Sequence, residues 1–325
     1  MKVLVTGGAG YIGSVVARRL RQEGHTTLVL DDLSEGHRAA AGPDLVVGDF
    51  ADRALVERLV RERGIEAVVH MAASCLVGES VEKPILYYRN NLEKSLALLD
   101  VLIDHGVGCF VLSSTAAVYG EPVAIPIDED HPTRPTNPYG ETKLALERAL
   151  LWLQAAGGLQ FVALRYFNAA GATRDGALGE FHDPETHLIP RVLAAAAGDD
   201  PVPILGTNYE THDGTAVRDY IHVEDLADAH VRALARLQAG GASAIFNLGN
   251  GAGYSVRQVI DTARRVTGRA IPVRDSARRP GDPATLVASS ARARRDLGWQ
   301  PVHDALEIII ESAWRFRIAH PHGYA

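Results

Sequence analysis

The sequence contains few of the residues that build disulfide-stapled proteins and has no long apolar segment. Among its 325 residues are 2 cysteines, 2 methionines and 3 tryptophans. Two thiols are too few for a disulfide scaffold, and we expect Cys75 and Cys109 to be buried or half-buried free thiols in a reducing cytoplasm. The longest apolar runs, such as Ile308–Ile310 and Ala194–Ala197, are far shorter than the roughly 20 residues that cross a bilayer. No membrane segment is therefore expected.

The chain also lacks long blocks of like charge. Its 33 basic and 40 acidic residues give a net charge of −7, which argues against a nucleic-acid partner held by phosphate contacts. The N-terminal stretch Met1–Thr6 does not lead into the apolar core of a signal peptide, because glycines follow at once. We therefore expect a cytoplasmic protein with a small-molecule partner.

What the sequence does contain is the composition of an ordinary folded protein. Hydrophobic residues make up 46% and charged residues 22%, and 325 residues fit about two domains. The first half alternates short β-branched segments with stretches whose apolar residues recur every three or four positions. This alternation predicts an α/β fold with a Rossmann-type, doubly wound parallel sheet. The expected strands are Lys2–Thr6, Thr26–Leu30, Leu45–Val47, Ala67–His70, Cys109–Ser113 and Phe161–Arg165.

The second half has a different composition, with longer loop-like stretches. Loops rich in Gly, Pro, Asp and His are expected at Gly171–Pro190 and Pro201–Gly214. We expect residues 1–170 to form the Rossmann domain, with later segments crossing back to it, and residues 171–325 to form a smaller α/β region. The expected elements of this half are a strand at Ile245–Leu248 and helices at Arg191–Ala197, Val223–Leu237, Ser255–Thr267, Ser289–Leu297 and Asp304–Ile318.

A glycine-rich turn follows directly after the first expected strand. The chain has 31 glycines, more than the usual share of about 7%, and Gly7, Gly10 and Gly13 stand at a spacing of three where a helix is expected to begin. Without side chains at these positions, the backbone N–H groups of the helix N-terminus, including those of Tyr11 and Ile12, can face a pyrophosphate. A strand, such a turn and a helix in this order predict a dinucleotide-binding site.

Acidic residues follow the second and third expected strands. Asp31 and Asp32 come about 20 residues after the glycines, where a carboxylate accepts hydrogen bonds from an adenosine ribose. Two carboxylates there would repel a 2′-phosphate, which favours NAD over NADP. Asp49 and Phe50 follow the third strand, in a position to flank the adenine, although a plain loop aspartate would look the same in the sequence.

A tyrosine and a lysine begin a later helical stretch. Tyr139 and Lys143 are four residues apart, so on a helix they are neighbours on one face. A phenol with its ordinary pKa near about 10 is a poor base, but a nearby ammonium and a nicotinium ring would both lower the pKa of Tyr139. Tyr139 is then a candidate acid/base group for a sugar hydroxyl. Thr115, at the carboxyl end of the fifth strand, is placed to hydrogen-bond the same oxygen, although such residues also occur there for structural reasons.

In this order, the glycine turn, the Tyr-x-x-x-Lys pair and the Ser/Thr strand end resemble the extended short-chain dehydrogenase/reductase superfamily. Within it, the chain is most similar to the UDP-glucose 4-epimerase family, and the resemblance covers nearly the whole sequence. The stretch from Gly206 to Thr215 is especially diagnostic, because few relatives outside the 4-epimerases share it. The other matching segments are Val3–Ser14, Val77–Ser80, Tyr87–Asn91, Leu164–Asn168 and Val217–Val223.

The resemblance implies tightly bound NAD and the interconversion of UDP-galactose and UDP-glucose through a transient 4-keto-hexose. Tyr139 would take the proton of the sugar 4-hydroxyl while C4 gives hydride to NAD, Thr115 would hydrogen-bond the same oxygen, and Lys143 would bind the nicotinamide ribose. The hydride would then return to the opposite face of C4. The further cofactor residues that the resemblance implies are Met71, Ala72, Ala73, Asn90, Ser113 and Phe167. The implied substrate residues, mostly in the UDP-sugar-binding region 171–325, are Thr115, Tyr139, Asn168, His187, Leu188, Arg218, Tyr220, Arg279, Asp282 and Leu286.

Two positions depart from the pattern of this family. Cys75 stands where some members carry a cofactor-binding lysine, so that contact does not carry over. Leu286 stands where the family has either a tyrosine or a small residue, which leaves the acceptance of N-acetylated sugars open. The alternative function is therefore another UDP-sugar 4-epimerase, acting on a UDP-N-acetylhexosamine, a UDP-uronate or a UDP-pentose.

Other classes fit less well. Nucleotide-sugar 4,6-dehydratases carry Asp-Glu after the strand-end threonine and the related decarboxylases usually keep a glutamate there, whereas this chain has Ala116 and Ala117. A non-enzymatic NAD-binding relative would be expected to lack Tyr139 or Lys143. The 13 histidines show no metal-ligand spacing, so we expect no metal site and a structural role for His222.

The resemblance also implies a homodimer. Its four-helix bundle would be formed by Pro84–His105 and Tyr139–Ala155 of each subunit. The apolar residues of these helices could equally pack inside one subunit, so the sequence leaves the oligomeric state open.

Overall fold

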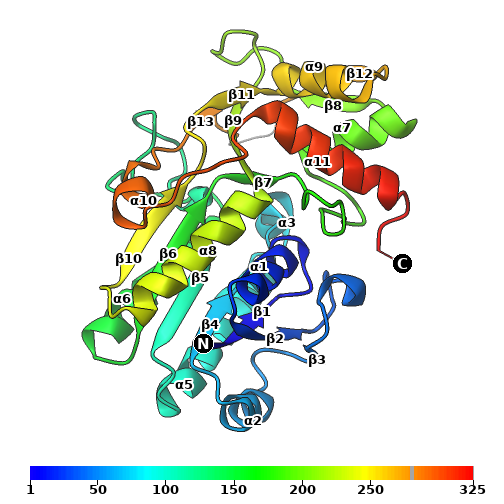
Figure 1. Ribbon diagram of the computed structural model, residues 1–325. Coiled ribbons are helices and arrows are strands. Elements are labelled where there is room, and N and C mark those ends of the chain that lie inside the picture. The colour runs from blue at the N-terminus through cyan, green and yellow to red at the C-terminus, as the bar shows by residue number, and fades with distance from the viewer. Residues whose placement is uncertain (279–281, 325) are drawn as a thin grey trace.

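The protein is described by a computed structural model, which covers residues 1–278 and 282–324. The larger part is built around a seven-stranded sheet with the strand order β10-β6-β5-β4-β1-β2-β3 (Figure 1). Every pair of neighbours in this sheet is parallel. Its strands are β1 (Lys2–Thr6), β2 (Thr26–Asp31), β3 (Leu45–Val47), β4 (Ala67–His70), β5 (Cys109–Thr115), β6 (Gln160–Tyr166) and β10 (Ala244–Leu248).

Helices cover both faces of this sheet. On one face, α1 (Tyr11–Gln22) and α8 (Val223–Gln238) pack over one cluster of buried apolar residues. On the other face, α2 (Arg53–Arg63), α5 (Lys94–Asp104) and α6 (Pro138–Ala155) pack over a second cluster. Strands covered on both faces need apolar residues at consecutive positions, which is why these segments read as nearly continuous apolar runs. The predicted Rossmann-type parallel sheet is confirmed.

A smaller part of the chain carries two small sheets. One has the order β11-β9-β13, with β7 also paired to β9, and the other pairs β12 with β8. A third apolar cluster lies among α7, α9 and α11. The strands are β7 (Asn168–Ala170), β8 (Val202–Leu205), β9 (Val217–His222), β11 (Gly253–Ser255), β12 (Val273–Ser276) and β13 (Thr285–Leu286). The helices are α7 (Leu188–Ala197), α9 (Val256–Thr267), α10 (Ala291–Asp296) and α11 (Leu306–Ala319).

The chain crosses between these two parts more than once. Both α8 and β10 come after residue 171 in the sequence, yet they belong to the seven-stranded sheet and its cover. The division at residues 170 and 171 remains a prediction. The remaining elements are α3 (Val77–Glu82), α4 (Pro84–Tyr87), a π-helical turn (Tyr88–Glu93) and 3-10 turns at Arg38–Ala40 and Ala116–Val118.

Some expectations for the second half were wrong. The expected loop Pro201–Gly214 contains the strand β8, whose partner β12 lies about 70 positions further along the chain. A four-residue strand that contains Pro203 carries little local signal, and only the distant partner makes it a strand. Within the described residues, no helix is long and apolar enough to cross a membrane. The location of the protein in the cell remains a prediction.

Candidate active site

The glycine turn joins β1 to α1 and leaves space beside the helix N-terminus. Gly7 has a φ of +70°, and a Cβ on Gly13 would lie 2.1 Å from the carbonyl oxygen of Gly7. A Cβ on Gly10 would come no closer than 3.4 Å to its neighbours. Among the described residues, no side chain caps α1 by a hydrogen bond, so the first N–H groups of the helix, including those of Tyr11 and Ile12, have no capping side chain there. This cradle fits the pyrophosphate of a dinucleotide.

Asp31, at the end of β2, holds the glycine turn in place. Its Oδ2 accepts the N–H of Ala9 at 2.9 Å, and its Oδ1 accepts the N–H of Leu33 at 2.9 Å. The residue is 8% exposed, and burial raises the pKa of the carboxyl. Asp32 is exposed instead, and its Oδ1 accepts hydrogen bonds from the N–H and the hydroxyl of Ser34. Asp31 is therefore the aspartate that couples the strand end to the turn, whichever of the two contacts the ribose.

The segment after β4 lies directly against the glycine turn. A Cβ on Gly7 would be 2.5 Å from the backbone nitrogen of Ala72. The N–H of Met71 continues the sheet pairing by donating to the carbonyl of Thr6 at 2.9 Å. Met71, Ala72 and Ala73 are all half-buried, and their contact with the cofactor remains a prediction.

Asn91 holds the backbone of Ser74, the residue after Ala73, and the sequence did not single out this asparagine. Its Oδ1 accepts the N–H of Ser74 and its Nδ2 donates to the carbonyl of Ser74, both at 2.9 Å. Asn90, which the resemblance did single out, donates to the Ser74 hydroxyl at 3.1 Å. The adjacent asparagines of the matching segment Tyr87–Asn91 were the available signal, because Asn is uncommon in helix interiors.

The two residues after β3 make contacts of their own. Asp49 forms an ion pair with Lys94 at 2.6 Å, and its Oδ1 accepts the N–H of Ala51. Phe50 is buried and packs edge-on against His70, with 5.1 Å between the ring centroids. Phe50 is thus largely a core residue, and its contact with the adenine remains a prediction.

Tyr139 and Thr115 meet at the carboxyl end of β5. The N-terminus of α6 is capped by Asn137, whose Oδ1 accepts the N–H of Gly140 at 2.9 Å. A Cβ on Gly140 would lie 2.5 Å from the carbonyl oxygen of Ala117, so glycine allows the helix to approach the turn after β5. The side chains of Thr115 and Tyr139 then lie close enough for the threonine hydroxyl to lower the pKa of the phenol. The two residues that were expected to share one substrate oxygen are therefore brought together.

Lys143 lies one helical turn beyond Tyr139. It is 2% exposed, and its Nζ donates to the carbonyl oxygen of Ser113 at 2.8 Å. Burial lowers the pKa of the Lys143 ammonium to about 8. Burial also raises the pKa of Tyr139, with a further increase from Cys75, while the Thr115 side chain works in the opposite direction. In the protein without a cofactor, burial therefore dominates the pKa of Tyr139, and the joint effect of the ammonium and a nicotinium ring remains a prediction.

The expected substrate residues gather around β9. Parallel pairing places Asn168 of β7 opposite Tyr220, and it places Leu286 of β13 opposite Arg218. Asn168 also donates from Nδ2 to the carbonyl oxygen of Asp219 at 3.0 Å. Strands on both sides of β9 thus assemble residues from three distant parts of the sequence. Phe167, which precedes β7, packs with Leu286 against a small apolar cluster around the turn after β5.

Arg218 forms an ion pair with Asp282. Its Nη2 lies 2.5 Å from Oδ1 of Asp282, and its Nη1 donates to the carbonyl of Val217 at 2.7 Å. The side chains are 13% and 28% exposed, so a ligand can reach them. A guanidinium binds phosphate oxygens in a bidentate manner, which suits a diphosphate. Arg279, the other arginine that the resemblance implied, lies outside the described residues.

His187 and Leu188 stand at the junction of the segment after β7 with α7. Leu188 is the first residue of this helix and packs against the third apolar cluster. Burial acts to lower the pKa of His187, but hydrogen bonds to Glu180 and Glu185 prevail and raise it to about 11. Sequence reasoning missed both glutamates. A charged imidazole here suits an anionic sugar nucleotide.

Cys75 lies between the two groups of site residues. Its thiol interacts electrostatically with Lys143 and His187, and it contributes to the pKa of Tyr139. Surrounding protein atoms raise the pKa of the thiol itself. Cys75 is nevertheless solvent-accessible, so the expectation of a buried or half-buried thiol was wrong for it and holds for Cys109. The physical reason is its position beyond the carboxyl end of β4, at the sheet edge where such folds leave room for ligands.

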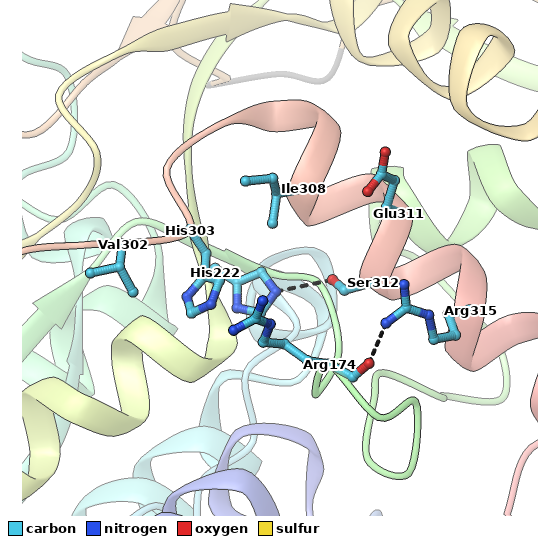
Figure 2. Close-up of a pocket in the computed structure, with 8 residues that line it drawn as sticks. All are labelled: Arg174, His222, Val302, His303, Ile308, Glu311, Ser312 and Arg315. Atoms are coloured by element: carbon cyan, nitrogen blue, oxygen red, sulfur yellow. Dashed lines mark hydrogen bonds between the residues drawn. The ribbon is translucent and has the colours of Figure 1, made fainter.

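His222 ends β9 and caps α8. Its Nδ1 accepts the N–H of Glu224 at 3.1 Å, and its Nε2 lies 3.0 Å from the hydroxyl of Ser312. The ring stacks on His303, with 4.7 Å between the centroids, and burial together with His303 lowers the pKa of His222 to about 4. His222, His303 and Ser312 line a cavity of about 350 Å³ (Figure 2). The contacts of His222 are those of the structural residue that the sequence predicted.

The fold, the glycine cradle and the grouping of Thr115, Tyr139 and Lys143 define a dinucleotide-dependent enzyme of the short-chain dehydrogenase/reductase type. A model of the NAD dependent epimerase/dehydratase family matches residues 3–249. The chain belongs to this family, and NAD is the cofactor that the glycine turn and Asp31 predicted.

Known UDP-glucose 4-epimerases match this chain over nearly its whole length. The UDP-glucose 4-epimerase of Halalkalibacterium halodurans is 52% identical, and the match covers 100% of this chain and 98% of the relative. The solved structure of UDP-glucose 4-epimerase from Brucella ovis in complex with NAD has a TM-score of 0.94 at 47% identity, over 97% of this chain and 98% of that one. The structure of UDP-glucose 4-epimerase from Bifidobacterium longum in complex with NAD+ and UDP has a TM-score of 0.94 at 38% identity, over 100% of both chains.

Proposed function

We propose that this chain is a UDP-glucose 4-epimerase. It interconverts UDP-galactose and UDP-glucose by oxidising the sugar at C4 to a transient 4-keto-hexose and reducing it again from the opposite face. The observation that carries the proposal is the grouping of Thr115, Tyr139 and the buried Lys143, whose Nζ donates to the carbonyl of Ser113, at the edge of a sheet that carries the glycine cradle. Two relatives named UDP-glucose 4-epimerase, which are 52% and 49% identical over the whole chain, support the proposal.

Three side chains divide the work at the reacting carbon. Bound NAD supplies the hydride acceptor and donor for C4. Tyr139 takes the proton of the 4-hydroxyl as the ketone forms and returns it as the alcohol is restored. Thr115 holds the same oxygen through its hydroxyl, and Lys143 binds the nicotinamide ribose and favours the phenolate of Tyr139 in the loaded enzyme. No net oxidation results, because the same hydride leaves and returns.

The other substrate residues hold the UDP end. Arg218 supplies positive charge to the diphosphate and His187 supplies a ring N–H, while Asn168 and Tyr220 lie opposite each other on the neighbouring strands β7 and β9. Leu286 lies opposite Arg218 in the register, which makes it the residue to vary when N-acetylated sugars are tested. The alternative, a 4-epimerase for a different UDP-sugar, is not favoured. The relatives that are 49–52% identical over the whole chain are named UDP-glucose 4-epimerase.

The proposal is tested by incubating the purified protein with UDP-galactose and measuring UDP-glucose. In Tyr139→Phe, the ring remains and the transferable proton is lost, so we expect turnover to fall roughly 10²- to 10⁴-fold. The amount of NAD bound per chain is measured in parallel, and it should be unchanged. Tyr88→Phe serves as the control, because Tyr88 is an exposed tyrosine. Full turnover in Tyr139→Phe would sink the proposed chemistry.

We further propose that the chain forms a homodimer through the surface around α6. Helices α3 and α4 and the π-helical turn that follows them all contact α6. Exposed apolar side chains are concentrated on these elements and on α5, and Trp152 is 78% and Ile85 62% exposed. The full set is Val77, Val81, Ile85, Leu86, Tyr88, Leu96, Leu151 and Trp152. A second copy brings the same apolar residues to a two-fold interface, which accounts for this surface.

The dimer is tested by light scattering on the purified protein. The double substitution Ile85→Glu and Trp152→Glu places charges on two helices of the proposed interface, and we expect the mass of the monomer. Val123→Glu is the matched control, because Val123 is 74% exposed and lies outside these helices. A monomeric wild-type protein at micromolar concentration would refute the interface.

A further inference from the structure

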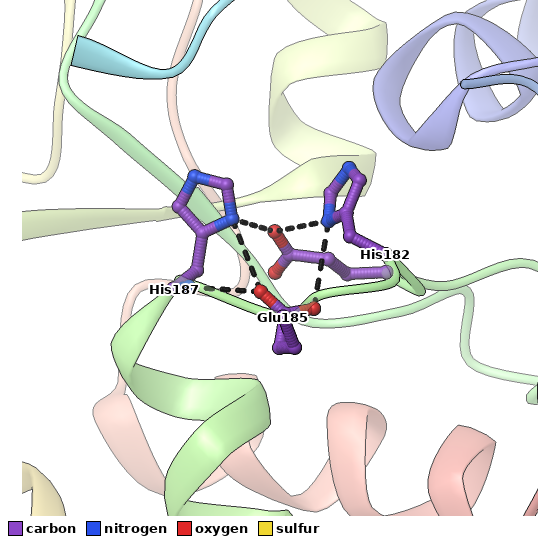
Figure 3. Close-up of side chains that lie close together, drawn as sticks. His182, Glu185 and His187 are labelled. Carbon is purple, nitrogen blue, oxygen red and sulfur yellow. Dashed lines mark hydrogen bonds and ion pairs between the residues drawn. The ribbon is translucent and has the colours of Figure 1, made fainter. Parts of the chain in front are cut away.

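Four titratable side chains from one short segment converge between β7 and α7. Figure 3 shows His182 and His187 turning a ring nitrogen toward Glu185. Nδ1 of His187 lies 2.8 Å from Oε1 of Glu180 and 3.3 Å from Oε1 of Glu185. Nδ1 of His182 lies 3.6 Å from Oε1 of Glu180 and 3.5 Å from Oε2 of Glu185. We refer to these four residues as the Glu/His cluster.

We propose that the Glu/His cluster binds one divalent transition-metal ion of the zinc class. The four ligand atoms all lie within 4.8 Å of one another. Zinc bonds of about 2.0–2.2 Å in a tetrahedral arrangement separate neighbouring ligand atoms by roughly 3.4 Å. The four nitrogen-to-oxygen distances, from 2.8 to 3.6 Å, already bracket this spacing. An ion therefore fits after side-chain shifts smaller than the bond lengths themselves.

The donor set fits this class of ion. Two imidazole nitrogens and two carboxylates favour zinc and similar transition metals over Mg²⁺ and Ca²⁺, which prefer oxygen ligands alone. Two carboxylate charges balance a divalent cation when both imidazoles are neutral. Within the described residues, Nδ1 of His182 is buried and makes no hydrogen bond. Its contacts with Glu180 at 3.6 Å and Glu185 at 3.5 Å are ion-pair contacts longer than an ordinary hydrogen bond, and coordination would give this buried nitrogen a closer partner.

The surroundings supply support and access. Oε1 of Glu185 accepts the N–H groups of Thr186 and His187, both at 2.8 Å, so the backbone of the segment orients this carboxylate. Glu180, His182 and Glu185 also line a cavity of about 250 Å³, which provides an entry path for an ion. The sequence predicted no metal site, because the spacing Glu-x-His-x-x-Glu-x-His matches none of the usual zinc motifs.

A metal at Nδ1 would also fix the tautomer of the His187 ring. With Nδ1 coordinated, the proton of the neutral ring is on Nε2, which faces away from the Glu/His cluster in Figure 3. On the proposed function, this N–H is available to the diphosphate of the UDP-sugar. Metal binding itself does not depend on that function and is measured without any sugar nucleotide.

The test is a titration of the full-length, chelator-treated protein with Zn²⁺ by calorimetry. We expect one ion per chain, and we expect Co²⁺ at the same site to give the absorption spectrum of a tetrahedral complex, whereas Mg²⁺ does not bind. His182→Gln and Glu185→Gln should each weaken Zn²⁺ binding at least about 100-fold, because loss of an outer-shell partner alone costs up to this much. His212→Gln is the control, since His212 is an exposed histidine beside a single aspartate.

Two outcomes would overturn the proposal. One is the absence of saturable Zn²⁺ binding, which leaves the Glu/His cluster as a network of protonated histidines and carboxylates. The other is binding that survives in both variants, which places the ion elsewhere on the surface. Epimerase activity is measured separately on the same preparations, so failure of the metal site and failure of the proposed function remain distinguishable.

Discussion

The two halves of the active site hold their charged side chains in different ways. On the cofactor side, Asp31 accepts the N–H of Ala9 in the glycine turn, and Lys143 donates to the carbonyl of Ser113 in β5. On the substrate side, Arg218 and His187 pair with acidic side chains. Backbone partners are fixed by the fold before any ligand arrives, whereas an acidic side chain can give up its cation to a phosphate. We therefore expect the cofactor side to be organised by folding and the ion pairs of the substrate side to rearrange when a phosphate binds.

Burial separates the two sides in the same way. Glu147 of α6 and Arg165 of β6 form an ion pair in which both residues are at most 4% exposed. The Arg218–Asp282 pair has 13% and 28% of its side chains exposed. A charge with no access to water needs its partner in order to fold, while a half-exposed charge can be solvated. The comparison therefore predicts large stability effects on the cofactor side and small ones on the substrate side.

The largest expected effect is that of Glu147→Gln. Oε1 of Glu147 accepts the Ser114 hydroxyl at 2.5 Å, and Oε2 accepts Nη2 of Arg165 at 2.5 Å. Glutamine keeps the shape but leaves the guanidinium uncompensated in the interior, so we expect the free energy of unfolding to fall by about 3–5 kcal/mol. Chemical unfolding in the absence of ligands measures this change.

An exposed ion pair provides the control for that substitution. Arg18 and Asp175 form a pair at 2.6 Å with 34% and 49% of their side chains exposed. Asp175→Asn should change the free energy of unfolding by no more than about 1 kcal/mol. Equal losses in Glu147→Gln and Asp175→Asn would mean that burial does not distinguish the pairs.

A smaller effect is expected for Asp31→Asn. The amide nitrogen of asparagine must face one of the two backbone N–H groups that Asp31 now accepts, and an unpaired buried donor costs about 1–3 kcal/mol. NAD binding should weaken, and discrimination against NADP should fall because a negative charge is lost. Unfolding and cofactor titrations measure both, with the exposed Asp32→Asn as control. Unchanged affinity for both cofactors would remove Asp31 from the site.

The sequence predicts the cofactor side well, because its signals are local. The strands β1, β3 and β4 begin and end where the apolar segments predicted, and the glycine turn lies between β1 and α1 as expected. Gly13 is demanded by a contact within the same turn, and Gly7 is demanded by its own φ of +70°. A local contact leaves its trace in neighbouring residues, and that is what a single sequence can reveal.

The substrate side could be predicted only through the family resemblance. Asn168, Arg218 and Leu286 come together through strand pairs of two or three residues, whose partners lie far apart in the chain. Such short strands have too little periodicity to be recognised. The sequence did not reveal the contact between Glu180 and His187 for a different reason: this contact depends on how one segment folds back on itself. The raised pKa of Tyr139 also required the structure, because burial cannot be read from the spacing to a lysine.

The smallest change in stability is expected for Arg218→Lys. An ammonium can still pair with the half-exposed Asp282, so the free energy of unfolding should change by no more than about 1 kcal/mol. The ligand affinity should respond much more strongly, because lysine loses the planar fork that binds a phosphate with two hydrogen bonds. Loss of one hydrogen bond to a charged group costs about 1.5–3 kcal/mol, which corresponds to roughly 10- to 100-fold weaker binding of UDP.

Calorimetry with UDP and with NAD, together with chemical unfolding, separates these effects. NAD affinity should be unchanged in Arg218→Lys, since Arg218 lies on β9 and the glycine turn lies between β1 and α1. Arg265→Lys is the matched control, because Arg265 forms an exposed pair with Glu307 elsewhere in the same half. A large loss of stability with unchanged UDP affinity would make Arg218 a folding residue like Arg165, and the contrast between the two sides of the site would disappear.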